Sequence, residues 1–235
     1  NIKKPFGLEY LVSDEDLIQI NRSYLQEAVS ELGYGGRSMS LMAYYKYDDK
    51  EPEFPISYNF SLFKDNSLFY GAIARIKYHF GKYGVGATYE YEHKGGENKI
   101  SANGYGLHAF YESNEFNAMA ELFYVQDPFE SIRQRLMNND ENIYAFGGKI
   151  FLAYKFDYDY DFLKGLEPFI LSNIYIPNQE VSGNNVIQLV TGINYYLHKD
   201  VKLRLNGDLR LTKNQFNTEH TADDSRIILE LQMRY

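Results

Sequence analysis

The feature that most constrains this chain is a two-residue alternation of apolar and polar side chains, seen most clearly in its last eleven residues. Apolar residues occupy one face of this strand-like stretch: Ile227, Leu229, Leu231, Met233 and Tyr235. Polar residues occupy the other face: Arg226, Glu230, Gln232 and Arg234. Almost every strand-like segment repeats the pattern, and too few helices are predicted to cover the apolar faces. The pattern predicts an all-β, closed transmembrane antiparallel β-barrel with lipid outside and water inside.

Composition separates this barrel from a helical membrane protein. The mean hydropathy is −0.47, and no apolar run approaches the roughly 18–20 residues that a spanning helix needs. The 23 Tyr and 16 Phe residues, with no Trp, suit the aromatic girdles of a barrel. The net charge of −8 argues against nucleic-acid binding. The lack of cysteine is compatible with an envelope protein.

Period-two segments bounded by turn residues predict twelve strands in a single domain over residues 1–235, of lengths that suit tilted bilayer-crossing strands. The first is short and ends near Pro5 to Tyr10. The others are expected at 36–47, 55–63, 68–80, 83–94, 103–113, 116–125, 143–156, 166–176, 186–198, 201–212 and 225–235. Strand 166–176 is apolar on both parities, so its orientation stays open.

Connections between these strands alternate in length, as in outer-membrane barrels. If the C-terminus is periplasmic, the longest connections (126–142, 177–185 and 213–224) all lie on the extracellular side. The connection Asp157 to Gly165 is long for a periplasmic turn.

Residues 13–32 break the strand pattern. Ser13 and Asp16 have capping-box spacing, and Leu17, Ile20, Tyr24, Ala28 and Leu32 form a helical stripe. We predict that a loop at 11–34 carries a short helix and folds into the lumen as a constriction loop. The alternative is a helix that lies outside, over the rim.

Two stretches resemble the phosphate-selective porins of the O and P type. The first is Pro5-Phe6-Gly7-Leu8-Glu9 with Asn21-Arg22-Ser23, which is similar to that family's PFGLE and (E)RS elements. The second is the hairpin that contains Thr191-Gly192-Ile193-Asn194-Tyr195-Tyr196-Leu197. The resemblance implies a sixteen-stranded, usually homotrimeric channel in the bacterial outer membrane.

If the loop at 11–34 is that family's third, inward-folded loop, the twelve strands are strands 5–16, and the chain resembles the C-terminal three quarters of the family. Asn1 leads directly into Lys-Lys-Pro without an apolar leader, so a signal peptide has been removed or the chain begins inside a longer protein. The rival interpretation is a complete twelve-stranded barrel.

Strand parity assigns eleven basic and six acidic side chains to the lumen, a surplus of positive charge despite the acidic chain. The pore-lining candidates are Arg75, Lys77, Lys149, Lys202, Arg204, Arg210, Arg226, Glu90, Glu121 and Glu230. A basic lumen concentrates anions and steers them inward. The alternative is that these side chains pair with one another across strands.

The constriction loop, in contrast, is acidic. Its candidate residues are Asp14, Glu15, Asp16, Arg22 and Glu27. A phosphate would meet like charges there, so phosphate selectivity is disfavoured. Arg22 is predicted to tether the loop, by reaching one of its carboxylates, rather than to bind a ligand.

These observations predict a passive diffusion channel for small hydrophilic solutes with a mild anion preference and with lipid as its partner. The alternatives are a barrel anchor that binds partners through loops 126–142 and 213–224, and an outer-membrane enzyme. No HExxH, GxSxG, GxGxxG or metal-ligand spacing occurs, so we expect no enzyme, cofactor or metal. His93 with Glu90 and Glu92 is the least weak catalytic candidate, and a solvated cluster at the rim is favoured instead.

Overall fold

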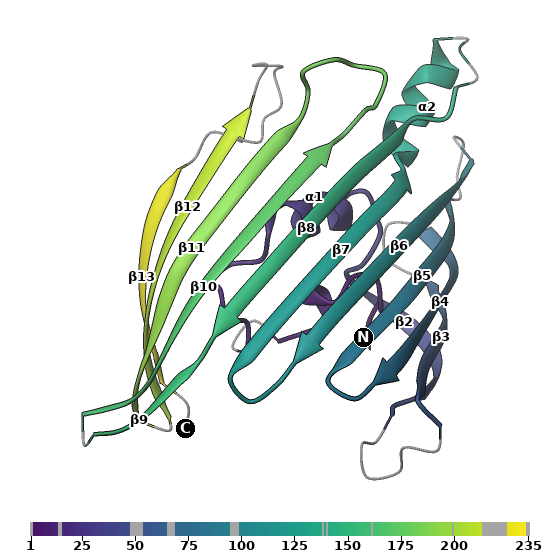
Figure 1. The fold of residues 1–235 in the computed structure, drawn as a ribbon. Helices are drawn as coiled ribbons and strands as arrows, with labels where there is room; N and C mark the ends of the chain where they lie inside the picture. The colour runs from purple at the N-terminus through teal and green to yellow at the C-terminus, as the bar shows by residue number, and fades with distance from the viewer. Residues whose placement is uncertain are drawn as a thin grey trace.

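One antiparallel sheet dominates the structure (Figure 1). The computed structural model describes residues 2–13, 16–47, 54–64, 69–94, 99–137, 139, 141–160, 162–198, 200–212 and 225–233. Twelve strands pair in chain order, and β9 pairs with β10 as a side branch. Because each strand pairs with its neighbour in the sequence, most connections of the meander are hairpins. The long exception is the connection over residues 4–36.

The strands are β1 (Ile2–Lys3), β2 (Arg37–Tyr45), β3 (Ile56–Lys64), β4 (Phe69–Phe80), β5 (Tyr83–Lys94), β6 (Ile100–Glu112), β7 (Phe116–Gln126), β8 (Tyr144–Tyr154), β9 (Phe156–Tyr160), β10 (Leu163–Ile176), β11 (Val186–His198), β12 (Val201–Thr212) and β13 (Arg226–Met233). The helices are a 3-10 turn (Glu9–Leu11), α1 (Tyr24–Glu31) and α2 (Pro128–Leu136). Among the described residues, no helix is long and apolar enough to cross a bilayer.

The predicted strands are confirmed to within a few residues, with three informative differences. Strand β1 ends at Lys3, before the predicted end between Pro5 and Tyr10, because the 3-10 turn follows. Strand β6 begins at Ile100, three residues early. The long turn expected at 157–165 is a hairpin of β9 and β10 with a register shift between Leu163 and Gly165.

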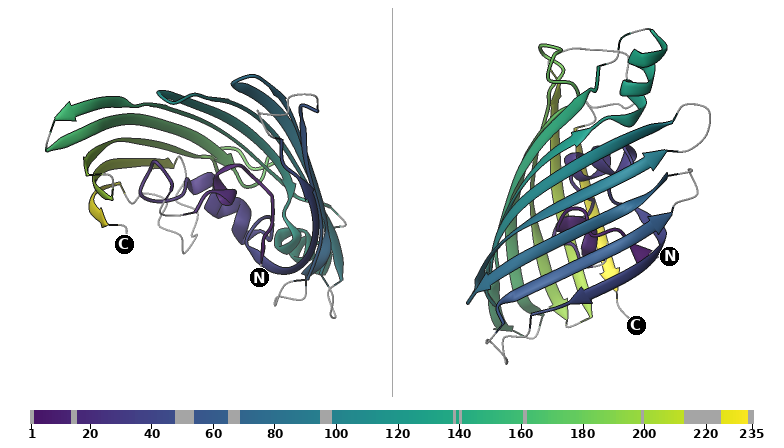
Figure 2. Two further views of the ribbon diagram at one scale, coloured as in Figure 1. Left: turned by 90° about the horizontal axis from the view of Figure 1, so that it is seen from below. Right: turned by 90° about the vertical axis from the view of Figure 1, so that its right-hand side faces the viewer.

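The sheet curves into an arc, and the N-terminal segment lies on its concave side (Figure 2). Strands β1 and β13 end the pairing order, and within the described residues no pairing joins them. The closed cylinder that the alternation predicts is therefore not formed by the described strands. Strand β1 has two residues, too few to pair along the eight residues of β13.

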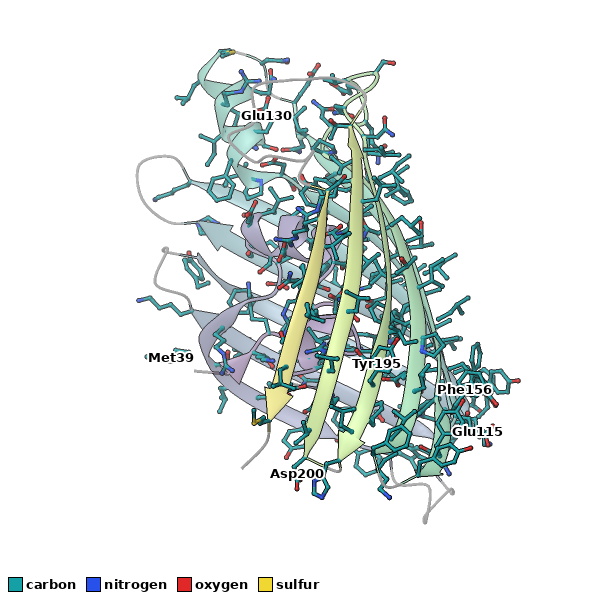
Figure 3. All side chains as sticks on the ribbon, turned by 90° about the vertical axis from the view of Figure 1, so that its left-hand side faces the viewer. Met39, Glu115, Glu130, Phe156, Tyr195 and Asp200 are labelled. Carbon is teal, nitrogen blue, oxygen red and sulfur yellow. The ribbon has the colours of Figure 1, made fainter. Side chains whose placement is uncertain are left out.

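Side-chain burial confirms the two faces that the alternation predicts. Large apolar side chains are exposed on the convex face, among them Tyr58, Phe60, Leu62, Ile76, Leu107, Ile150 and Leu209. Figure 3 shows such side chains projecting outward around Phe156 and Tyr195. Polar side chains are buried on the concave face, among them Arg75, Glu90, Glu121, Lys149 and Arg204.

Strand β10, whose parity the sequence leaves open, directs Phe169, Leu171 and Tyr175 to the concave face and exposes Ile170. Phe169 and Leu171 are apolar on the concave side because Ile18 of the N-terminal segment packs against their cluster. The inner wall is therefore not polar throughout. It is apolar where the segment covers it.

Candidate functional site

Residues 4–36, here called the inward segment, form the candidate site. The two ends of the segment meet where the backbone N–H of Lys4 donates to the carbonyl of Gly36 at 2.9 Å. The segment lies within the arc of the sheet (Figure 2), with α1 against β8 and β10. This placement confirms an inward-folded loop with a short helix and rules out the alternative of a helix outside the rim.

The predicted helix start is wrong. Helix α1 begins after Ser23, whose hydroxyl accepts from the backbone N–H of Gln26 at 3.3 Å. Ser13 and Asp16 do form a side-chain hydrogen bond, and the N–H of Leu17 donates to the Ser13 carbonyl at 3.1 Å. This turn does not continue as a helix, because the carbonyls that follow it are held by the sheet, as described below.

One side of the segment is an apolar core. Phe6, Leu25, Val29 and Tyr34 are buried, and they pack in one cluster with apolar residues of the sheet. The sheet residues of this cluster are Phe63, Ile73, Ala102, Phe123, Val125, Ala145 and Tyr175. Gly147 permits the closest approach, because a Cβ there would overlap the Leu25 side chain. Burial on this scale stabilises the segment as part of the fold.

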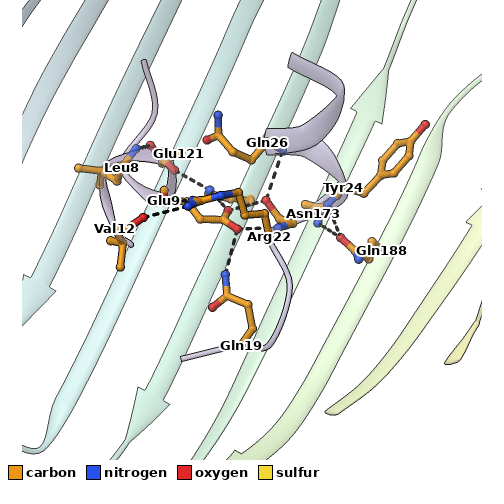
Figure 4. Close-up of polar contacts among 12 residues, drawn as sticks. Leu8, Glu9, Val12, Gln19, Arg22, Tyr24, Gln26, Glu121, Asn173 and Gln188 are labelled. Atoms are coloured by element: carbon orange, nitrogen blue, oxygen red, sulfur yellow. Dashed lines mark hydrogen bonds and ion pairs between the residues drawn. The ribbon is translucent and has the colours of Figure 1, made fainter. Parts of the chain in front are cut away.

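The polar anchor of the segment is Glu9, which is buried among donors (Figure 4). Its carboxylate accepts from the backbone N–H and hydroxyl of Ser23 and from Gln19 Nε2 at 3.0 Å. It also pairs with the Lys149 ammonium on β8. Lys149 in turn lies 2.8 Å from Glu121 Oε2 on β7. A buried carboxylate with this many partners fixes the start of α1 to the wall.

The charge of Glu9 is maintained by these partners. Burial alone raises the pKa of a carboxyl, but the Lys149 ammonium and the Ser23 hydrogen bonds outweigh it, so the pKa of Glu9 lies below its ordinary value. Glu9 therefore stays ionised at neutral and mildly acidic pH. Sequence reasoning missed this role, although Glu9 is the acidic end of the quoted PFGLE stretch.

Arg22 acts within the segment. Its guanidinium donates to the backbone carbonyls of Glu9 and of Val12, the latter at 2.9 Å. The tether to a loop carboxylate stays a prediction. Arg22 and Ser23 thus join the (E)RS element to the PFGLE element, because both residues bond Glu9. Their sequence separation gave no sign of this contact.

A second anchor is Arg204 on β12. One guanidinium nitrogen, Nη2, donates to the carbonyls of Leu17 at 2.8 Å, Ile18 at 3.1 Å and Gln19. The other, Nη1, pairs with Glu230 on β13 at 2.9 Å. These three carbonyls belong to the stretch predicted as helix. A planar, multi-donor guanidinium suits such convergent acceptors.

A third anchor, also missed in the sequence, is Lys4. Its ammonium lies 2.7 Å from Glu90 Oε1 and 3.9 Å from Glu92 Oε2, both on β5. It also lies 4.1 Å from the centroid of the Phe63 ring. The acidic residues Glu90 and Glu92 thus hold the segment. The solvated rim cluster that the sequence favoured for Glu90 and Glu92 with His93 is therefore wrong for the two glutamates, which are buried.

The remaining predicted wall residues have different partners: some lie beside a carboxylate, and others lie over an aromatic ring. Arg210 lies 3.1 Å from Asp208 and 5.3 Å from the Tyr24 ring centroid. Arg226 lies 3.5 Å from the same Asp208. Lys77 lies over the Phe110 ring at 5.2 Å, and Lys202 over the Tyr196 ring at 5.6 Å. Cross-strand pairing, the alternative interpretation of the wall, thus accounts for part of the basic surplus.

Arg75 on β4 stands apart. It is 4% exposed, and none of its three guanidinium nitrogens has a hydrogen-bond partner among the described residues. The acidic side chain that attracts its charge, Glu121, is already bonded to Lys149 and to the N–H of Leu8. Arg75 is therefore a buried cation on the concave face that forms no hydrogen bond of its own among the described residues.

Two of the predicted loop acids can be placed. Asp16 and Glu27 are exposed on the segment, whereas Asp14 and Glu15 lie outside the described residues. Surrounding protein raises the pKa of Glu27, and the Arg210 charge opposes this rise. Glu27 therefore faces basic wall residues rather than other loop carboxylates alone.

Comparison with known proteins gives a match in structure but not in sequence. No family model and no curated protein match the chain. A solved structure of a porin, refined at 1.8 Å, superposes with a TM-score of 0.56 at 11% sequence identity. The match covers 83% of this chain and 61% of that porin, so the chain spans less than two thirds of its length. The chain has a porin-like all-β fold.

Proposed function

We propose that the chain forms the wall and the narrowing segment of a passive channel for small hydrophilic solutes in a bacterial outer membrane. One observation carries the proposal. The sheet has an apolar convex face and a polar concave face, and a folded segment is anchored within the arc. A segment held there narrows the path along the concave face. The porin-like fold supports this function.

The outer face supports a bilayer location. Aromatic pairs that are at least partly exposed occur near both ends of the strands, such as Tyr124 with Tyr144 at 4.8 Å and Tyr83 with Tyr111 at 4.7 Å. Exposed aliphatic residues such as Leu107 and Ile150 lie between them. Two aromatic girdles around an apolar band match the cross-section of a membrane. The end with the short turns at 81–82 and 113–115 is then periplasmic.

A mild anion preference is the selectivity that the wall supports best. Most basic side chains form ion pairs with Glu121, Glu90, Asp208 or Glu230, whereas Arg75 makes no hydrogen bond among the described residues. The charge of Arg75 acts on passing ions over a short range only, because salt screens it within about 8–10 Å. A strongly phosphate-selective site is not supported.

Reconstitution tests the proposal. We expect liposomes that contain the purified protein to swell in isotonic sugars up to a size limit, and planar bilayers to show single-channel steps. The reversal potential in a salt gradient should indicate weak anion selectivity. Impermeable liposomes would favour the barrel anchor, and a cation-selective reversal potential would overturn the anion preference. Homotrimer formation is a further proposal, to be tested by the mass of the native oligomer.

An enzymatic function is not proposed. The Ser57 hydroxyl lies 2.8 Å from His79 Nε2, but the His79 ring stacks on Tyr47 at 4.6 Å and meets the edge of Phe110 at 5.6 Å. Such packing fits a structural hydrogen bond.

A further inference from the structure

Aromatic rings form a continuous path along the convex face at the short-turn end of the sheet. Successive ring centroids are 5.7, 4.7, 5.7, 6.5 and 4.6 Å apart along Phe80, Tyr83, Tyr111, Phe116, Tyr154 and Phe156. These contacts cross from β4 to β9. The path forms the lower aromatic girdle of the proposed membrane wall.

The aromatic series continues beyond the wall on the β9–β10 hairpin. Tyr158 stacks on Tyr160 at 5.9 Å, and Tyr160 on Phe162 at 6.1 Å. All three rings are exposed, and Phe162 at the tip is 77% exposed. Soluble surfaces rarely present such a row of exposed aromatic rings, so the row indicates a binding surface.

The opposite face of the hairpin is charged. Lys155 and Asp157 alternate in the sequence with the aromatic residues at the end of β8 and the start of β9, and they pair at 2.9 Å. Phe156 pairs with Leu166, and Asp157 with Gly165, so the two residues of β9 follow the outward and inward parities of β10. The hairpin therefore has an aromatic outer face and a charged inner face.

The hairpin extends past its neighbours. Within the described parts of the chain, strand β9 pairs with β10 and belongs to none of the other strand pairs. Figure 1 shows it at the lower left, reaching away from the sheet, and the left view of Figure 2 shows the same hairpin at the outer end of the arc. Its aromatic face consequently continues the girdle sideways from the wall.

We infer that the β9–β10 hairpin docks its aromatic face onto the headgroup region of the periplasmic leaflet, as a lateral extension of the girdle. This inference rests on the membrane location proposed above. Tyr rings favour that zone, where the apolar ring is shielded and the hydroxyl stays hydrated. Continuity with the girdle selects lipid as the occupant, and the inner Lys155 and Asp157 pair stays in water.

The absence of Trp from the sequence allows a direct test, because any Trp introduced is the only one. In Phe162→Trp protein in phospholipid vesicles, we expect fluorescence quenching by lipids brominated near the headgroup, as strong as in Tyr83→Trp on the girdle. Its emission should be blue-shifted, and aqueous iodide should quench it weakly. Glu180→Trp, in the exposed loop at 177–185, is the water-facing control and should show the reverse.

Leu107→Trp, in the middle of the convex face, distinguishes the hairpin inference from the proposed membrane location on which it rests. Quenching of Leu107→Trp and Tyr83→Trp, with Phe162→Trp behaving like Glu180→Trp, would overturn the hairpin inference alone. If Leu107→Trp is not quenched by any brominated lipid, the proposed membrane wall itself is wrong. Blue-shifted Phe162→Trp emission that brominated lipid leaves unchanged, and that is lost when oligomers are dissociated, would assign the face to a second copy of the chain and overturn the lipid assignment.

Discussion

Lys149 and Arg75 are basic side chains on the same concave face, yet their surroundings are opposite. Lys149 is buried between Glu9 of the inward segment and Glu121 of the wall. Arg75 is equally inaccessible, and it has no hydrogen-bond partner among the described residues. The first charge holds the structure together, because it pairs with carboxylates of both the segment and the wall. The second has the charge of Glu121 nearby but makes no direct bond to it.

The comparison shows that strand parity predicts which face a charged side chain occupies but not what that side chain does. Parity places both residues inside. Lys149 pairs with a carboxylate of the inward segment, that of Glu9, which is distant from it in the sequence. Variants at the two positions should therefore separate stability from selectivity.

The largest effect is expected for Lys149→Met. Removing the ammonium leaves Glu9 and Glu121 as facing buried carboxylates, and breaking a buried pair in this way costs about 3–5 kcal/mol of unfolding free energy. Urea unfolding in detergent measures the loss, and planar bilayers should show a larger conductance as the segment loosens. The double variant Glu9→Gln with Lys149→Met should recover part of the stability. Wild-type stability in Lys149→Met would show that the pair does not anchor the segment.

Acid should release the same anchor, but only well below neutrality. Since the pKa of Glu9 is lowered in the folded state, its contribution is fully present above the ordinary value of 4.5 and is lost as the pH falls through the lower folded value. We expect constant conductance from neutral pH down to this range and a rise below it. A conductance change near neutral pH that Glu9→Gln abolishes would contradict this sign.

Arg204→Lys should have the next largest effect. A single ammonium cannot serve three carbonyls and Glu230 in the planar geometry of the guanidinium, so the unfolding free energy should fall by about 1.5–3 kcal/mol. Limited proteolysis within residues 17–22 should accelerate. Lys202→Arg, on the same strand, is the control and should leave cleavage unchanged.

Arg75→Met should alter selectivity with little change in stability, because no buried partner loses a bond. Removal of one unit charge near the ion path changes the anion energy by about 0.5–1 kcal/mol, or about 2–5-fold in the permeability ratio. Reversal potentials measure this shift toward cations. Arg133→Met, on the distant helix α2, is the matched control. An unchanged reversal potential would remove Arg75 as the origin of the anion preference.

The smallest expected effect concerns Glu27. Because burial raises its pKa above the ordinary value of 4.5, protonation begins at higher pH than for a free carboxyl. Anion selectivity should therefore increase slightly as the pH falls toward that value, and Glu27→Gln should lack this increase. An identical pH dependence in the variant would exclude Glu27 from the ion path.

The strands were predictable from the sequence because each of them carries its own two-residue pattern, which needs no knowledge of its partners. The start of α1 was not, since Ser13 and Asp16 make a real local turn, and the distant Arg204 and Asn194 bind the carbonyls that an extended helix would use. The parity of β10 was hidden for a related reason. Its inner residues Phe169 and Leu171 are apolar because the segment covers them.

The candidate site was predictable only in outline. An inward loop follows from the interruption of the strand pattern, and Arg22 was identified within it. The roles of Glu9 and Lys4 depend on contacts with β5, β7 and β8 that no local spacing encodes.

The contacts of Arg204 also impose an order on assembly. The wall can grow by adding hairpins between sequence neighbours, each closing a short loop. The inward segment comes early in the chain, yet its acceptors at residues 17–19 wait for a donor 185–187 residues later. Such distant contacts form late, because loop-closure entropy opposes them until the intervening chain is organised. The growing wall consequently passes through a stage in which the inward segment is not yet held at residues 17–19. The last strands to form fix its position.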